Sequence, residues 1–364
     1  MIWPESGDDF VDGGPFFNYV TYEGSPTGVQ VDLNDRSAVG QGTDTLRRIT
    51  GVGGSEGDDV LVGTEGSDDL HGYGGDDSIT SGDGDDFLNS GAGNDNIVGG
   101  AGFDFLDIAY SNAGPRLDDD TLTDAGAVID LAAGTISGGE GVGEDVISGI
   151  EGAGGTLGDD TITGNDSFNE LVGFEGNDTI DVGEPGEPDE LGTQDLVLPG
   201  AGNDTVTGSS GTDAVDYGFL SLTQEPTGGV TIDLKDGTAT GPDVGDDSLT
   251  SIETAAGTIF DDSITGTSLA NVLIGLDGSD AINGEAGDDT LDGDAYAFGS
   301  PSELEGQDSL DGGPGTDICV GGESNTDCEM SELPSQLSAT ATLPSRALTP
   351  LARTMARGYQ RHLM

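Results

Sequence analysis

The chain has 364 residues, of which 71 are Asp or Glu and 9 are Lys or Arg, so its formal net charge is −62. Only 33% of the residues are hydrophobic and 66 are glycine, which is close to the composition of an intrinsically disordered chain. Self-repulsion would oppose a compact state unless a cation neutralises the acids, and nucleic acid is excluded as that partner because its phosphates would be repelled.

A nine-residue block, PESGDDFVD, opens the chain at residues 4–12, and the same pattern becomes regular from residue 54. Residues 54–107 divide into the blocks GSEGDDVLV, GTEGSDDLH, GYGGDDSIT, SGDGDDFLN, SGAGNDNIV and GGAGFDFLD. Each block has Gly at position 4, Asp at position 6 and an aliphatic residue at position 8. The position-6 residues of this first array are Asp59, Asp68, Asp77, Asp86, Asp95 and Asp104. An acidic linker has no reason to place an apolar residue every ninth position, so a folded repeat is predicted.

Two less regular arrays follow, at 155–181 with 199–216 and at 257–292 with 303–320. Their position-6 aspartates are Asp160, Asp178, Asp204, Asp213, Asp262, Asp280, Asp289, Asp308 and Asp317. Asn169 and Asn271 stand where Asp is expected, and insertions interrupt the arrays at 182–198 and 293–302. We therefore expect fewer or weaker sites in these arrays than in the first.

A longer period lies over the short one. The segments VQVDL (29–33), AVIDL (127–131) and VTIDL (230–234) each precede a glycine-rich stretch and then Asp44, Asp145 or Asp247. Each of these acids lies 15 residues before the first position-6 Asp of the next array, which gives three units of about 101 residues. Their alternating apolar and polar residues predict half-buried strands that continue the repeat as irregular coils, although separate small β modules remain open.

The last part of the chain has the opposite charge. All 71 acids lie within residues 1–332, whereas residues 333–364 contain four arginines and no acid. The predicted divisions are a repeat remnant at 1–12, three units at 13–107, 108–216 and 217–329, each an irregular β segment followed by an array, and a basic tail at 330–364. The tail is interpreted as a secretion signal, a disordered extension or a short helix. No transmembrane segment is predicted, and the start MIWPESGDDF does not look like a secretory signal.

The nonapeptide resembles the hemolysin-type calcium-binding (RTX) repeat, G-G-x-G-x-D-x-U-x. This resemblance implies an all-β fold, a right-handed parallel β-roll or β-helix solenoid in which two blocks form one coil. It also implies several Ca²⁺ ions between stacked turns, each held by backbone carbonyls and by position-6 carboxylates from both turns. All the position-6 aspartates of the three arrays are thus candidate calcium ligands.

In the first array, the implied stacked pairs are Asp59 with Asp77, Asp77 with Asp95, Asp68 with Asp86, and Asp86 with Asp104. Asp104 would end its stack and contribute to one site. Asp76, at the variable position 5, would point away from the ligand positions, so that its loss is expected to be nearly silent.

Other motifs carry less weight. Residues 53–57 (GGSEG) match the G-x-S-x-G nucleophile elbow, but they fall in a repeat turn. The only histidines are His71, expected to face solvent at position 9, and His362. No catalytic residue or organic cofactor is predicted. Cys319 and Cys328, nine residues apart, could form a disulfide that closes the last coil or remain two buried thiols.

Together these features predict a secreted, extracellular calcium-binding protein or surface module that folds on binding Ca²⁺ and is not an enzyme. The alternative is a non-catalytic C-terminal accessory or secretion region of an extracellular enzyme or toxin whose catalytic domain is missing, which a start inside a repeat favours. The resemblance points to a bacterial source. Calcium ions are the expected partners, with an unidentified extracellular or cell-surface partner, no nucleic acid and no membrane span.

Overall fold

The computed structural model describes residues 1–15, 17–109, 124–139, 141–184, 194–218, 227–294, 306–322 and 324–330. These ranges contain strands and turns but no helix. They form two compact units, one up to Ile162 and one from Thr163 onward, and β17 (Thr161–Thr163) spans the division. The predicted tail beyond residue 330, with His362, lies outside the described residues. The predicted five-part division of the chain stays a prediction.

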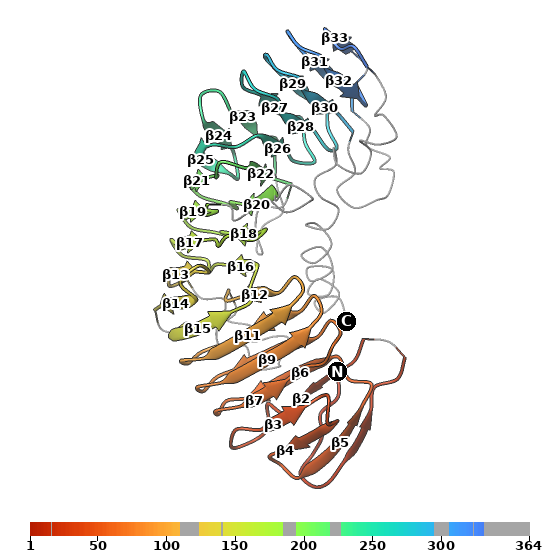
Figure 1. Ribbon diagram of the computed structural model, residues 1–364, viewed down its shortest axis with the longest axis vertical. Coiled ribbons are helices and arrows are strands. Elements are labelled where there is room, and N and C mark those ends of the chain that lie inside the picture. Colours follow the sequence, from red (N-terminus) through yellow and green to blue (C-terminus); the bar gives the residue numbers. More distant parts are fainter. Residues whose placement is uncertain are drawn as a thin grey trace. The chain divides into compact units, whose positions relative to one another are not determined.

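In the first unit the chain alternates between two sheets, called sheet A and sheet B. In spatial order, sheet A contains the parallel strands β2 (Tyr19–Thr21), β6 (Gly51–Ser55), β8 (Asp69–Tyr73), β10 (Phe87–Asn89), β12 (Phe105–Asp107) and β16 (Gly152–Gly154). In spatial order, sheet B contains β1 (Phe10–Asp12), β5 (Thr43–Arg47), β4 (Ser37–Val39), β3 (Gln30–Asp32), β7 (Val60–Val62), β9 (Ser78–Asp83), β11 (Asn96–Ala101), β15 (Glu144–Ser148), β14 (Thr135–Gly138) and β13 (Ala127–Asp130). Figure 1 shows β7, β9 and β11 side by side.

The second unit repeats this arrangement. In spatial order, its part of sheet A contains β18 (Glu170–Val172), β20 (Gln194–Leu198), β22 (Thr212–Asp216), β26 (Thr254–Ala256), β28 (Val272–Ile274), β30 (Thr290–Asp292) and β32 (Ile318–Val320). In spatial order, its part of sheet B contains β19 (Thr179–Asp181), β21 (Thr205–Thr207), β25 (Gly245–Thr250), β24 (Thr238–Gly241), β23 (Thr231–Asp233), β27 (Ser263–Thr265), β29 (Ala281–Asn283), β31 (Ser309–Asp311) and β33 (Ser324–Thr326).

Position-8 residues form the core between the two sheets. Leu70 pairs with Leu88 in sheet A, and Leu61 pairs with Ile79 in sheet B, so equivalent residues lie 18 positions apart. Each of these four side chains is 0% exposed. One nine-residue block therefore supplies a turn and one short strand, two blocks complete a coil, and the narrow core is filled by one aliphatic side chain from each block.

The irregular segments continue sheet B as three-stranded meanders. In the first unit β3 pairs antiparallel with β4 and β4 with β5, while β3 pairs parallel with β7 and β5 pairs parallel with β1. The segments β13–β15 and β23–β25 have the same antiparallel order. Of the two interpretations left open by the sequence, continuation of the solenoid is the one observed, with a reversal of strand direction that alternation alone did not predict.

The aspartate of each VDL or IDL segment forms the first turn of its meander. The side chains of Asp32, Asp130 and Asp233 accept hydrogen bonds from the backbone N–H of Asp35, Ala133 and Asp236, at 2.9, 2.7 and 2.9 Å. Such side-chain to backbone contacts are a common way to start a turn. This explains why the three segments share an aspartate at the same place.

The outer face of sheet A is more buried than expected. The His71 side chain is only 15% exposed, its Nε2 contacts Asp69 Oδ1, and its ring lies 5.8 Å from those of Tyr19 and Phe87. The expectation that position 9 faces solvent was therefore wrong for His71.

The two cysteines are joined as the disulfide Cys319–Cys328, with Cα atoms 5.9 Å apart.

We predict that the core depends on position 8 more than on the other strand positions. Leu88→Ala removes a fully buried side chain and should lower the free energy of unfolding by about 2–5 kcal/mol in saturating calcium. The control Val60→Ala alters a strand residue that is 40% exposed and should cost about 0.5 kcal/mol. Denaturant unfolding measures both, and equal losses would contradict this account of the core.

Candidate metal sites

The position-6 aspartates lie in two columns in the turns before the strands. In the first unit the backbone N–H of one Asp donates to Oδ1 of the equivalent Asp on the next coil. The donor–acceptor pairs are Asp59–Asp77, Asp77–Asp95 and Asp68–Asp86 at 2.7 Å each, and Asp86–Asp104 at 3.1 Å. The structure therefore brings together the four pairs that the repeat spacing implied.

The same contacts recur in the second unit. The pairs Asp178–Asp204, Asp262–Asp280, Asp280–Asp308 and Asp289–Asp317 are each joined by a 2.8 Å hydrogen bond from backbone N–H to Oδ1. Every position-6 aspartate named from the sequence, including Asp160 and Asp213, is at most 4% exposed. Negatively charged carboxylates thus lie next to one another in buried rows, where water cannot screen their repulsion.

One carboxylate oxygen of many column residues has no hydrogen-bond partner. In the described ranges these buried oxygens are Oδ2 of Asp77, Asp86, Asp95, Asp104, Asp280, Asp289 and Asp317, and Oδ1 of Asp68 and Asp213. A buried, unpaired carboxylate oxygen is costly unless a proton or a cation accompanies it. The repeated pattern places one such oxygen beside each of many stacked turns.

Backbone oxygens gather around the same carboxylates because position 1 has little or no side chain. A Cβ on Gly72 would overlap Oδ2 of Asp77 and the carbonyl oxygen of Ser90 on the next coil. A Cβ on Gly284 would lie 2.5 Å from Oδ2 of Asp289 and 2.9 Å from the carbonyl oxygen of Gly312. Glycine therefore lets a carboxylate and a carbonyl from two coils face one place.

This donor set fits calcium, which prefers six to eight oxygen ligands and accepts backbone carbonyls. Within the described part of the chain, no three His, Cys, Asp or Glu side chains cluster as a metal site by themselves. A calcium shell here would therefore combine the column carboxylates with carbonyl oxygens of the turns, as the resemblance implied.

Burial and stacking change the protonation of the column. Burial, followed by the charges of Asp59 and Asp95, raises the pKa of Asp77 to about 9 against the opposing hydrogen bond from Asp59. Burial and the charge of Asp86 raise the pKa of Asp104 to about 8. Without a cation, these carboxyl groups hold protons at neutral pH.

The columns also include acids that the nonapeptide count missed. Asp195, inside the insertion at 182–198, accepts a 2.7 Å bond from the N–H of Asn169 and so occupies a position-6 place. Glu151, Glu253 and Glu329 accept bonds through Oε2 from the N–H groups of Asp104, Asp213 and Asp317, at 3.0, 3.0 and 2.7 Å. The repeated segments GIEGAGGT (149–156) and SIETAAGT (251–258) were the signal for two of these glutamates. Asp104 is therefore not the end of its column, which corrects the first expectation.

Asp44, Asp145 and Asp247 extend the other column into the meanders. Their Oδ1 atoms accept bonds from the N–H groups of Asp9, Asp95 and Asp204, at 3.0, 2.9 and 2.9 Å. The spacing singled these acids out without giving them a role. The structure gives them the hydrogen bond of a position-6 residue.

Position 5 forms a second, exposed row of contacts between coils. The N–H of Asp76 donates to Oδ1 of Asp58 at 3.0 Å, and Oδ1 of Asp76 accepts from the N–H of Asn94 at 2.9 Å. Asp76 therefore joins three coils, and the expectation that Asp76→Ala would be nearly silent needs correction. An Asp76→Asn variant retains the acceptor and is the better control.

The GGSEG segment has a structural role in the column. Oγ of Ser55 donates to Oδ1 of Asp59 at 2.9 Å, and the N–H of Ser55 donates to Oδ2 of the same residue at 2.6 Å. Thr156 and Thr258 hold Asp160 and Asp262 in the same way. The serine that resembled a nucleophile thus orients a candidate metal ligand.

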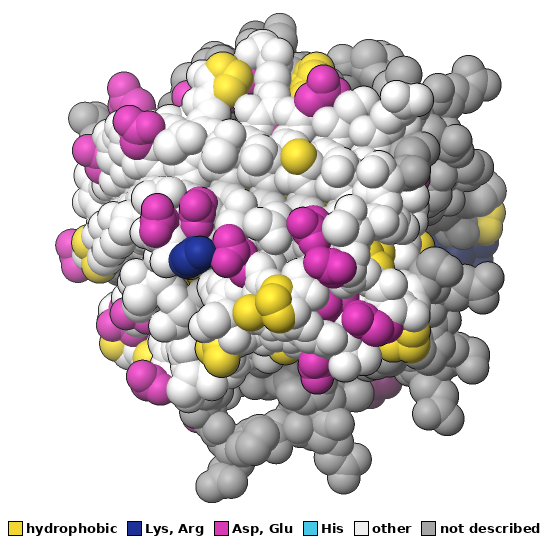
Figure 2. Space-filling model, turned by 90° about the horizontal axis from the view of Figure 1, so that it is seen from above, with side chains coloured by type: hydrophobic (Ala, Val, Ile, Leu, Met, Phe, Trp, Pro, Cys, Tyr) yellow, Lys and Arg dark blue, Asp and Glu magenta, His cyan; other side chains and the backbone are white. Residues whose placement is uncertain are grey.

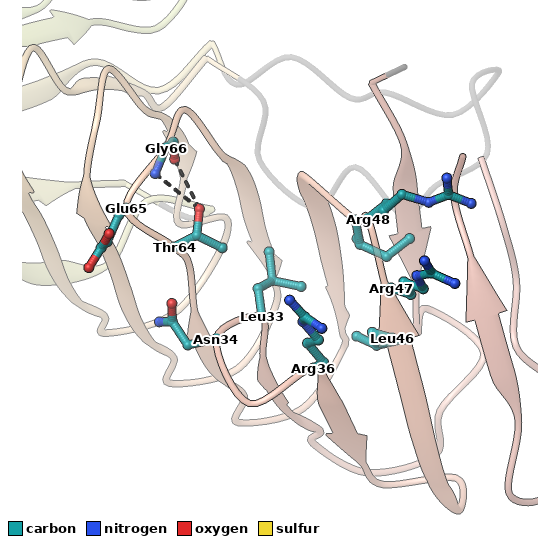
Figure 3. Close-up of a pocket in the computed structure, with 10 residues that line it drawn as sticks. Leu33, Asn34, Arg36, Leu46, Arg47, Arg48, Thr64, Glu65 and Gly66 are labelled. Carbon is teal, nitrogen blue, oxygen red and sulfur yellow. Dashed lines mark hydrogen bonds between the residues drawn. The ribbon is translucent and has the colours of Figure 1, made fainter. Parts of the chain in front are cut away.

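A separate surface pocket gathers basic residues. Its lining includes Arg36, Arg47 and Arg48, together with Leu33 and Leu46. Figure 3 shows the three arginines on one side, and Thr64 with Gly66, whose contacts are drawn as dashed lines, on the other. Arg47 and Arg48 form ion pairs with Asp12, so part of this positive charge is neutralised internally.

Comparison with known families agrees with this geometry. Residues 53–88, 77–106, 154–184, 200–219, 265–295 and 304–326 match the RTX calcium-binding nonapeptide repeat. The chain therefore carries RTX repeats, its described residues form an all-β roll of parallel strands that the antiparallel meanders interrupt, and the repeats imply calcium binding. No curated protein matches the chain. In the described ranges, no helix is long and apolar enough to cross a membrane.

We predict that charge at position 6 matters more for calcium than charge at position 5. Asp77→Asn keeps an acceptor for the N–H of Asp59 but removes a ligand charge, so the calcium midpoint should rise by about tenfold or more. Asp76→Asn removes one exposed charge next to it and should leave the midpoint within about twofold. Calcium titrations followed by circular dichroism compare the two variants, and equal shifts would mean that the acids act only as a diffuse negative field.

The raised pKa values predict that acid stabilises the calcium-free fold. An unfolded Asp has a pKa of about 3.9, whereas Asp77 and Asp104 in the fold have pKa values of about 9 and about 8. Between these limits the folded state holds protons that the unfolded chain has lost, so stability is greatest at low pH and is lost as pH rises. Calcium-depleted protein should therefore gain β signal in circular dichroism on going from pH 9 to pH 5.5.

Calcium binding should have the opposite pH dependence to the stability of the calcium-free fold, because calcium binds ionised carboxylates. The calcium midpoint should be higher at pH 5.5 than at pH 8. A calcium-depleted protein with the same β signal at both ends of the range would contradict the assignment of these buried protons.

Proposed function

We propose that the chain is a calcium-dependent structural or binding module of a secreted protein, which folds after export when Ca²⁺ binds between its stacked turns. The observation that carries this proposal is the row of buried position-6 carboxylates, several of which, such as Asp77 and Asp86, have an oxygen without a partner in the described residues, within segments that match RTX calcium-binding repeats. The cation would neutralise charges that otherwise oppose folding.

Two features support an extracellular location. The Cys319–Cys328 disulfide suits an oxidising compartment, since cytosolic thiols are kept reduced. The affinity expected for such oxygen sites, on the order of 10⁻⁶ to 10⁻³ M, suits extracellular calcium better than the low cytosolic concentration. The chain would therefore remain unfolded before export and fold outside the cell.

We also propose that the module has no catalytic role of its own. Ser55 and His71, the two described residues that the sequence raised as catalytic candidates, contact Asp59 and Asp69 and serve the fold. Apart from the pocket lined by Arg36, Arg47 and Arg48, the described surface offers acidic side chains rather than a basic track. Figure 2 shows one face on which Asp and Glu are spread among uncharged residues while Lys and Arg are few.

Calcium titration of the full chain tests the central proposal. The calcium-free protein at pH 8 should lack most of its β signal, and added Ca²⁺ should restore it cooperatively. Magnesium should substitute poorly, because it requires a smaller and more regular octahedral shell. The proposal fails if chelated and calcium-loaded protein have the same spectrum and melting temperature.

Location is tested separately by fractionation of the source cells. The folded protein should be found in the extracellular fraction or at the cell surface. Folded protein confined to the cytoplasm would overturn the export proposal without affecting the calcium sites.

A further inference from the structure

The first array meets the next meander at a junction built from Asp95 and Asp145. The N–H of Asp95 donates to Oδ1 of Asp145 at 2.9 Å, which repeats the contact between Asp77 and Asp95. The turn before Asp145 also follows the repeat. A Cβ on Gly143 would overlap the carbonyl oxygen of Gly93, just as a Cβ on Gly93 would overlap that of Gly75. Gly143 and Asp145 thus reproduce positions 4 and 6 outside any complete nonapeptide.

Within the described residues, three buried side-chain oxygens at this junction have no hydrogen-bond partner outside their own group, in which the Ser90 hydroxyl faces both carboxylates. They are Oδ2 of Asp95, Oδ2 of Asp145 and Oγ of Ser90. The three residues are 2%, 2% and 1% exposed. Two carboxylates and a hydroxyl are hard oxygen donors of the kind that calcium binds.

At the equivalent junction in the second unit, the second carboxylate oxygen has a hydrogen-bond donor. Asp247 accepts the N–H of Asp204 through Oδ1, and its Oδ2 accepts the hydroxyl of Tyr217 at 2.7 Å. At the start of the chain, the hydroxyl of Tyr22 donates to Oδ2 of Asp44 at 3.0 Å. A tyrosine therefore satisfies the second oxygen at both of these junctions.

Ile108 stands in the place of the tyrosine in the middle repeat. Its N–H donates to the carbonyl of Gly154 at 3.3 Å, as the N–H of Tyr217 does to Ala256 at 3.1 Å and that of Tyr22 does to Gly53 at 2.9 Å. An isoleucine side chain cannot donate a hydrogen bond. Among the described residues, Oδ2 of Asp145 therefore lacks the tyrosine donor that the equivalent oxygens of Asp44 and Asp247 have.

We propose that Asp145, Asp95 and Ser90 form a calcium site outside the nonapeptide motif, and that Tyr22 and Tyr217 close the corresponding places at Asp44 and Asp247. The inference rests on the proposed calcium function and extends it to an acid in a meander. It assigns different roles to three aspartates that occupy the same position in the long repeat. Asp145 binds a metal, whereas Asp44 and Asp247 bind a phenol.

Counting bound calcium on the full chain by equilibrium dialysis tests this site. Asp145→Asn retains an acceptor for the N–H of Asp95 and should bind one ion fewer than the natural chain. Asp247→Asn is the matched control in the second unit and should bind the same number as the natural chain. Ser90→Ala, at a position where most blocks have glycine, provides a second variant that leaves the charges intact. It should weaken one site by about tenfold.

The converse variant is Tyr217→Phe, which removes the donor to Asp247 and should add one bound ion. An unchanged count in this variant would overturn the role given to the tyrosine. An unchanged count in Asp145→Asn, together with unchanged affinity in Ser90→Ala, would overturn the site itself while the natural chain still binds calcium. If the natural chain binds none, the proposed function fails first, and the two failures are thereby distinguished.

Discussion

Burial of like charges in rows is the constraint on which this structure depends. Each nine-residue block, which is half of a coil, contributes one aliphatic side chain to the core, such as Leu70 or Ile79. The hydrophobic stabilisation from so thin a core cannot outweigh a large electrostatic cost. Yet the same period places an aspartate beside another on the next coil. The fold is stable only where a hydrogen-bond donor, a proton or a cation compensates the buried carboxylates. This requirement links composition, architecture and function.

Buried carboxylates in this chain have three kinds of surroundings. Tyr217 donates its hydroxyl to Asp247, Ser55 donates to Asp59, and other acids such as Asp77 retain an oxygen with no protein donor. A carboxylate oxygen that accepts from a tyrosine needs neither a proton nor a metal, a serine orients its carboxylate toward the site, and an oxygen without a donor depends on a proton or a metal. The distribution of these hydrogen-bond donors along the chain therefore decides which coils respond to calcium.

The sequence predicted the regular part of the fold because a fixed period leaves little freedom. Once Asp59 and Asp77 are two blocks apart, their stacking follows. The nine-residue spacing did not predict the acids of the columns where the period is interrupted. Asp195 lies in an insertion, and Glu151 has a longer side chain that reaches the same place from an irregular segment. His71 was misjudged because position in a strand predicts the face of a sheet but not what covers that face.

The last coil has a consequence for association between molecules. Among the described strands, β32 is the last of sheet A, and an open edge of this kind can template aggregation. The disulfide from Cys319 to Cys328 holds the following residues against this edge, where Met330 pairs with Ile318 and its carbonyl accepts the N–H of Cys319 at 2.9 Å. A covalent staple thus acts as an end cap, so oxidation would protect a roll that already has its calcium from growing end to end into fibres.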